Sequence, residues 1–125
     1  MMQQDKVKVY VLNPTDIRGC YKVIDDELEI LQSIVDGYIE FITLKVNKDG
    51  SRLGLILNED GKYREDLLPN CFLIDKEISE KPIDILIGTL IFTRVDEEGY
   101  SRDITEEDMK EMRKHLQRII PTMQI

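Results

Sequence analysis

"YIEFITLKVNKDGSRLGLILN", residues 38–58, is the stretch that decides the fold. Its Asp-Gly pair lies between two runs rich in β-branched, aromatic and aliphatic residues, and this arrangement predicts a β-hairpin. The two expected strands cover residues 39–46 and 52–58. Apolar residues occur on both alternating faces of 39–46, so we expect this strand to lie in the interior of a sheet. Gly54, inside the second run, indicates a bulge or a close backbone approach.

Two strands and a helix are predicted ahead of the hairpin. Residues 7–12 alternate and then run apolar, and residues 21–24 form a second, short β-prone segment. Apolar residues recur at helical spacing over 26–36, which predicts an amphipathic helix with acidic residues at its N-terminal end. Gly37 follows at the position where helices commonly end in a glycine.

A strand and a second helix are predicted behind the hairpin. Residues 71–74 form a short extended segment, and residues 77–82 read as a polar loop. Residues 83–95 then form a long β-rich strand that Gly88 interrupts. Residues 105–120 open with a sequence similar to a capping box and carry an apolar stripe, so they predict a helix that the following proline ends.

The order of these elements, roughly ββαββ-loop-βα, is typical of the α+β class. We expect a mostly antiparallel sheet of about four to six strands with two helices, the second of them C-terminal. Strands near 7–12, 39–46, 52–58 and 84–95 should share that sheet. The length of 125 residues fits one α+β domain over residues 1–125.

The composition disfavours several classes of partner. Lys and Arg number 17 against 25 Asp and Glu, and the resulting net charge of −8 makes binding to nucleic acid or to anionic lipid unexpected. An acidic surface remains compatible with a basic protein partner. No apolar run is long enough to span a bilayer and the N-terminus lacks a signal core, so we expect no membrane contact and a cytoplasmic protein.

Residues that carry metal or catalytic chemistry are scarce. His115 is the single histidine and is expected on the C-terminal helix, while Cys20 and Cys71 stand alone without a CxxC pair. A multi-histidine metal site is therefore excluded, and both thiols are expected to be reduced residues of the core or its rim. The adjacent carboxylates lack a partner that would make a hydrolytic pair. We predict no catalytic residue, no metal and no cofactor.

The segment "LNEDGKYREDLLPN", residues 57–70, is predicted to be a binding edge, because it brings charge, an amphipathic tyrosine and a Leu-Leu-Pro sequence together. In the alternative interpretation, Asn58 and Asn70 only hold turns through local backbone bonds. Gln32 could equally be a half-buried amide, and Glu40 an ordinary exposed carboxylate. The candidate binding residues are Gln32, Glu40, Asn58, Glu59, Tyr63 and Asn70.

Five segments carry a family pattern: LEILQSIVDGYIEFITL, LILNEDGK, LPN, IGTLIFTRVDEEG and ITEEDM. Together they resemble the domain-of-unknown-function 3846 family, over nearly the whole chain. Members of that family are small proteins of phages, prophages and conjugative elements, mostly without an assigned activity. The residues that match the family motifs are Gln32, Gly37, Ile39, Glu40, Asn58, Glu59, Gly61, Pro69, Asn70, Gly88 and Thr89.

The resemblance implies a protein of a phage or mobile genetic element in a bacterial cell. The leading hypothesis is a non-enzymatic module that binds and inhibits a host defence protein. A second hypothesis is a sponge that sequesters a small nucleotide immune signal as a homo-oligomer, and a third is an accessory role in replication or transfer of the element. The cationic candidates for a nucleotide pocket are Lys62, Arg64, Arg94 and Arg102.

The C-terminal residues indicate a homodimer. Met123 and Ile125 are apolar residues beyond the expected end of the helix. They could fold back onto the core or dock on a second subunit, and we expect the second.

Overall fold

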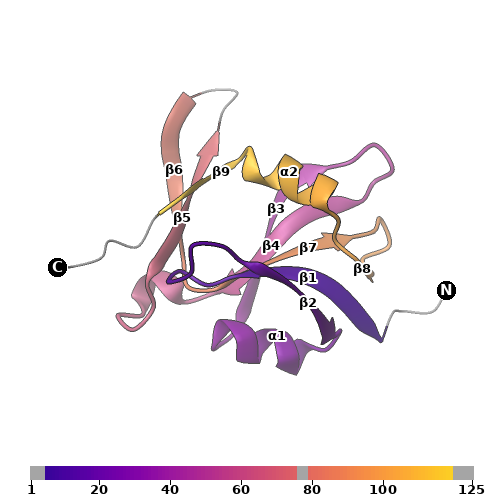
Figure 1. The fold of residues 1–125 in the computed structure, drawn as a ribbon, viewed down its shortest axis with the longest axis horizontal. Helices are drawn as coiled ribbons and strands as arrows, with labels where there is room; N and C mark the ends of the chain where they lie inside the picture. Colours follow the sequence, from indigo (N-terminus) through magenta and orange to yellow (C-terminus); the bar gives the residue numbers. More distant parts are fainter. Residues whose placement is uncertain (1–4, 76–78, 120–125) are drawn as a thin grey trace.

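Two antiparallel sheets and two α-helices make up the fold (Figure 1). The computed structural model describes residues 5–75 and 79–119, and it describes their side chains except at residues 75–83. The elements are β1 (Lys6–Leu12), β2 (Cys20–Asp25), α1 (Leu28–Val35), β3 (Ile39–Val46), β4 (Arg52–Asn58), the 3-10 helix η1 (Gly61–Tyr63), β5 (Pro69–Asp75), β6 (Ser79–Ile87), β7 (Leu90–Val95), β8 (Ser101–Arg102), α2 (Glu106–Arg113) and β9 (Leu116–Arg118).

The larger sheet has the order β2-β1-β7-β4-β3, with β8 paired to β7, and the smaller sheet has the order β6-β5-β9. Each strand pairing in the described ranges is antiparallel. The predicted α+β class, mostly antiparallel with the second helix C-terminal, is therefore confirmed. The strands predicted at 7–12, 21–24, 39–46 and 52–58 correspond to β1 to β4.

The predicted hairpin is formed by β3 and β4, and the turn between them contains Gly50 with φ of +86°. A register shift between Thr43 and Lys45 is the bulge that Gly54 indicated. A Cβ atom on Gly54 would overlap the carbonyl oxygen of Ile42, so the backbones do approach closely at this point. Only a residue without a side chain fits there.

β3 is an edge strand, which corrects the prediction that residues 39–46 lie inside the sheet. Among the described strands it pairs with β4 alone. Three of its apolar residues pack against the core: Ile39 against the cluster that includes α1, and Ile42 and Leu44 against the cluster that includes α2. Apolar residues on both faces of a strand indicate packing above and below the sheet. They do not indicate that another strand pairs on each side of it.

The strand predicted over 83–95 is two strands in different sheets. β6 ends at Ile87 and belongs to the smaller sheet, and β7 begins at Leu90 in the larger one. Gly88 makes the break with φ of +87°, a conformation that few other residues adopt. β6 also begins at Ser79, inside the stretch predicted as a loop, because pairing with β5 extends the strand into polar sequence.

The C-terminal helix is shorter than predicted. α2 ends at Arg113, a turn containing His115 follows, and β9 then pairs with β5. The carbonyl of His115 accepts a hydrogen bond from the N–H of Ile74 at 2.8 Å. Helical spacing alone assigned Leu116–Arg118 to the helix, but these residues pair with the free edge of β5 instead. Residues 120–125 lie outside the described ranges, and with them the predicted helix end at Pro121 and the dimer contacts of Met123 and Ile125.

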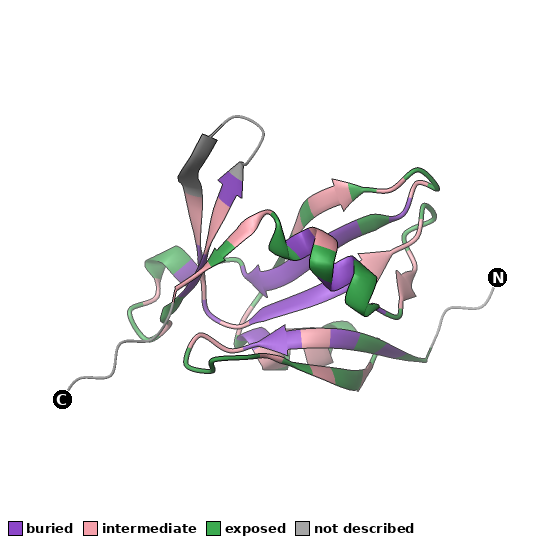
Figure 2. Cartoon of the chain, turned by 45° about the horizontal axis from the view of Figure 1, so that its top comes forward, coloured by how far each residue is buried: buried purple, intermediate pink, exposed green. Residues whose placement is uncertain are grey.

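The core consists of two clusters on opposite faces of the larger sheet, whose central strands carry most of the buried residues (Figure 2). One cluster, including Val9 and Ile91, packs against α1. The other includes Phe92 and Met112, and it extends to Leu86 of the smaller sheet. The two sheets therefore share the second cluster.

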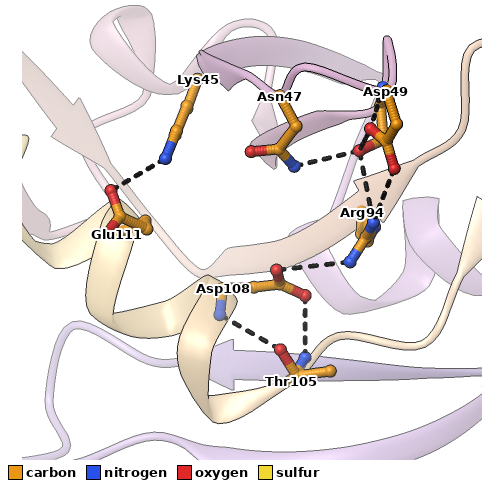
Figure 3. Close-up of polar contacts among 8 residues, drawn as sticks. Lys45, Asn47, Asp49, Arg94, Thr105, Asp108 and Glu111 are labelled. Atoms are coloured by element: carbon orange, nitrogen blue, oxygen red, sulfur yellow. Dashed lines mark hydrogen bonds and ion pairs between the residues drawn. The ribbon is translucent and has the colours of Figure 1, made fainter.

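Polar contacts attach α2 to the larger sheet (Figure 3). Thr105 and Asp108 form the predicted capping box at the start of the helix, and Asp108 lies 3.5 Å from Arg94 of β7. Lys45 of β3 pairs with Glu111 of α2 at 3.1 Å. No helix in the described part of the chain is long and apolar enough to cross a membrane.

Candidate functional site

Asn58, at the end of β4, is a buried residue that closes the end of α1. Its Nδ2 donates hydrogen bonds to the carbonyl oxygens of Val35 at 3.1 Å and Asp36 at 3.0 Å. Its Oδ1 accepts from the N–H of Asp60 at 2.8 Å. A Cβ on Gly37 would lie 2.6 Å from that Nδ2, so the family-pattern glycine makes room for the amide. Asn58 thus holds local backbone, as the alternative interpretation had it.

Gln32 takes part in the same helix end through its backbone. Its carbonyl accepts the N–H groups of Asp36 and of Gly37, the second at 3.0 Å. Asp36, and not the expected Gly37, is the left-handed residue of this cap, with φ of +62°. The half-buried Gln32 does not join the groove described below.

Asn70 is completely buried, with 0% of its surface exposed. Its Nδ2 donates to the carbonyl oxygens of Leu12 at 2.8 Å and Gly88 at 2.9 Å. Its Oδ1 accepts from the Arg118 guanidinium and from the Cys71 thiol. These bonds use both amide hydrogens and the oxygen, and they connect the larger sheet to the smaller one. Asn70 therefore has a structural role, and it offers nothing to a partner at the surface.

Three predicted binding residues, Glu40, Glu59 and Tyr63, meet in one groove of about 230 Å³, and Asn58 contributes to its wall. Strands β3 and β4 supply one side, Glu59 and η1 supply the end, and β6 supplies the other side. Tyr63 has 88% of its surface exposed. The apolar residues that line the groove are Ile42, Leu57, Ile85, Leu86 and Ile87.

The charge of the groove is negative. Lys62 lines it, but its ammonium group pairs with Asp84 on the opposite side. That hydrogen bond raises the pKa of Lys62 above its usual value and lowers the pKa of Asp84. Glu40 and Glu59 are exposed and have no ion-pair partner among the residues that the structure describes. Two carboxylates that form no ion pair in the described ranges therefore face an opening with an apolar lining.

Each of the four cations considered for a nucleotide pocket is paired with a carboxylate. The pairs are Lys62 with Asp84, Arg64 with Asp36 and Asp66, Arg94 with Asp49 and Asp108, and Arg102 with Asp96. Arg94 and Arg102 line a wider cavity of about 500 Å³, whose other charged residues are acidic. Over the described ranges, no group of histidine, cysteine or acidic residues is arranged to hold a metal ion.

Sequence reasoning missed a cavity of about 410 Å³ between the β1–β2 loop, α2 and β9. Its lining includes Arg18, Arg113 and Arg118 together with apolar and aromatic residues. These residues come from segments far apart in the chain, so no local motif marks them. The sequence feature that could have indicated this cavity is an arginine next to apolar residues in each of three regions, at Arg18, Arg113 and Arg118.

These features define a class of small α+β protein in which two antiparallel sheets share a core and present an acidic groove between their edges. The family model described as "Domain of unknown function (DUF3846)" matches residues 7–117, and the chain belongs to this family. The search of curated proteins finds no match, and neither does the search of solved structures.

Proposed function

We propose that this protein is a non-enzymatic binding module whose groove takes up an extended, basic segment of a partner protein. The observation that carries the proposal is that Glu40 meets Glu59 and Tyr63, which were predicted from a different segment, in one acidic groove. An exposed tyrosine combines a large apolar contact area with a polar hydroxyl, and such residues are enriched in protein interfaces.

The backbone of β3 supports an extended occupant. The Tyr38 carbonyl accepts the N–H of Glu59 at 2.8 Å and so points toward the β4 side. Strand alternation then turns the backbone groups of Ile39, Phe41 and Thr43 away from β4, toward the free edge. A partner segment that added a strand here would satisfy these groups, as in other cases of β-augmentation.

The charges support a basic occupant. Glu40 and Glu59 form no ion pair among the described residues, and Lys62, the cation that lines the groove with them, is paired with Asp84. Lysine or arginine side chains of a partner would find both carboxylates within the groove. The net charge of −8 would also steer a basic partner toward the protein.

The biological setting is part of the proposal. We infer a protein of a phage or mobile genetic element that acts in the bacterial cytoplasm and inhibits a host defence protein by occupying one of its basic segments. The family resemblance supports this origin, and the acidic groove supports the mode of binding. A role in the element's own replication or transfer would use the same surface on a different partner.

The test is to select peptides from a random library against the protein and to measure their affinity by titration calorimetry. The selected peptides should carry Lys or Arg in a β-prone sequence. The double variant Glu59→Ala/Tyr63→Ala should weaken their binding at least about tenfold, since it removes an ionic and an aromatic contact, with little change in melting temperature. Glu98→Ala, an exposed carboxylate in the β7–β8 turn, is the matched control and should bind as the unchanged protein does.

The proposal fails if the double variant binds the selected peptides as tightly as the control, or if the selected peptides are acidic. Pull-down from a bacterial lysate then identifies natural partners as the proteins that Glu59→Ala/Tyr63→Ala loses and Glu98→Ala retains. A nucleotide released by heating the purified protein would favour the sponge hypothesis instead.

A further inference from the structure

The cavity between the β1–β2 loop, α2 and β9 has the size and lining of a small-molecule site. Its volume of about 410 Å³ lies within the range of roughly 300–1,000 Å³ that is usual for ligand pockets. Tyr10 and Phe92 lie edge to face with ring centroids 6.0 Å apart, and both line the cavity. The other apolar lining residues include Leu12, Met109 and Leu116. The cavity therefore offers aromatic and aliphatic walls.

Arg118 of β9 brings an uncompensated positive charge to this cavity. Its guanidinium donates to the carbonyl oxygens of Asn13 at 2.8 Å and Pro14 at 3.1 Å, and also to Asp16 O and Asn70 Oδ1. All four acceptors are neutral oxygens, and no carboxylate of the described residues pairs with the guanidinium. Its Nε is buried without an acceptor. Holding this positive charge among neutral groups is electrostatically unfavourable. An anion that binds nearby reduces that cost.

Two further arginines stand around the same opening. Arg18, in the β1–β2 loop, is exposed and has no ion-pair partner in the described part of the chain. Arg113 of α2 pairs with Glu106 at 2.8 Å, and its guanidinium lies 5.6 Å from the ring centroid of Tyr10. The positive potential is therefore carried by Arg18 and Arg118, in contrast to the paired arginines at the acidic cavity.

We propose that this cavity binds a small organic anion, one that joins an acidic head group to a flat apolar body. Arg18 would contact the head group directly, and the charge of Arg118 would attract it. The body would lie against Tyr10, Phe92 and Leu116. An inorganic anion would leave the apolar walls empty, and a neutral aromatic compound would leave both charges uncompensated, so only the combined chemistry uses the whole lining.

This site is separate from the acidic groove, which shares none of its lining residues. The proposal therefore stands whether or not a protein partner binds the groove. The head group can belong to an aromatic carboxylate or to a nucleotide, and the experiment separates these two sources.

The test is to titrate the isotope-labelled protein with naphthalene-2-carboxylate and to follow the amide chemical shifts by NMR. A final ligand concentration of about 5 mM allows a millimolar dissociation constant to be detected. Saturable shifts are expected at residues that line the cavity. Naphthalene-2-methanol tests the body without the charge, inorganic phosphate tests the charge without the body, and both should bind at least about tenfold more weakly. Adenosine monophosphate is the nucleotide arm, and tighter binding than naphthalene-2-carboxylate at the same residues would assign the site to nucleotides.

Arg18→Gln is the decisive variant, because Arg18 forms no hydrogen bond or ion pair with another residue in the described ranges. It should weaken anion binding about tenfold with an unchanged melting temperature. Arg52→Gln removes the same charge from an exposed position on β4 and should bind as the unchanged protein does. The proposal is overturned if neither organic anion produces saturable shifts at the cavity, or if Arg18→Gln and Arg52→Gln bind equally.

Discussion

Asn70 is a polar residue in a sequence that is typical of a surface loop, yet its side chain lies in the core. It stands beside Pro69 at the start of β5, yet its amide joins Leu12 of β1 to Gly88 between β6 and β7. A buried amide that bridges three segments leaves several polar groups unsatisfied when it is removed. Its contribution is therefore to stability.

Asn70→Ala should lower the free energy of unfolding by about 3 kcal/mol, measured by urea denaturation, because two carbonyls and part of the Arg118 guanidinium lose their partner. Gln117→Ala, at an exposed position on β9, is the control and should change it by less than about 0.5 kcal/mol. A variant Asn70→Ala that kept full stability and lost peptide binding would show instead that the amide contacts a ligand.

The elements of the fold are explained by two kinds of pattern. Local chemistry accounts for the hairpin turn at Gly50 and for the capping box of Thr105 and Asp108. Pairing between distant segments accounts for β9, which forms because β5 has a free edge beside it. The edge position of β3 also depends on how distant segments pair. The resulting orientation of its backbone groups can be tested directly.

Thr43→Pro should leave the protein folded, because strand alternation turns the Thr43 N–H to the free edge, where a proline removes no hydrogen bond to β4. The same substitution should weaken binding of the selected peptides, since it deletes one donor for an added strand. Ile42→Pro, on the β4 side, removes a hydrogen bond to β4 and also apolar packing, so it should lower the free energy of unfolding more than Thr43→Pro does. Equal melting temperatures for the two variants, by circular dichroism, would contradict the orientation assigned to β3.

At the scale of the whole molecule, the two sheets are expected to unfold together. Leu86 of β6 is 1% exposed and belongs to the same apolar cluster as Leu55 of β4. Asn70 adds polar contacts across the same boundary. A core shared in this way couples the smaller sheet to the larger one.

Leu86→Ala should lower the free energy of unfolding by about 3 kcal/mol, the usual effect of a cavity left by a buried leucine. Amide hydrogen exchange should speed up in β4 and β5 alike, because both lose stability when the shared core is weakened. Leu68→Ala, whose side chain is 51% exposed, is the control and should have a small effect. Faster exchange confined to the smaller sheet would show that the sheets unfold separately.

The sequence by itself determined the fold class, the β3–β4 hairpin, the bulge at Gly54, the presence of both helices and the capping box that starts α2. It also placed Glu40, Glu59 and Tyr63 among the binding candidates. Turn chemistry, capping and hydrophobic periodicity act over a few residues, so these features can be read from a short window of the chain. Glu40 and Glu59 come together because the open ends of β3 and β4 are neighbours by the register of the hairpin.

Only the tertiary structure decided how strands outside the β3–β4 hairpin are arranged and which polar residues are buried. The division of residues 83–95 between two sheets, the strand at Leu116–Arg118 and the edge position of β3 all depend on the partner that a segment meets. The burial of Asn58 and Asn70 and the cavity around Arg118 depend on it too. Their physical cause is contact between residues far apart in the chain, where the free energy of pairing and burial outweighs the weak preferences of the local sequence.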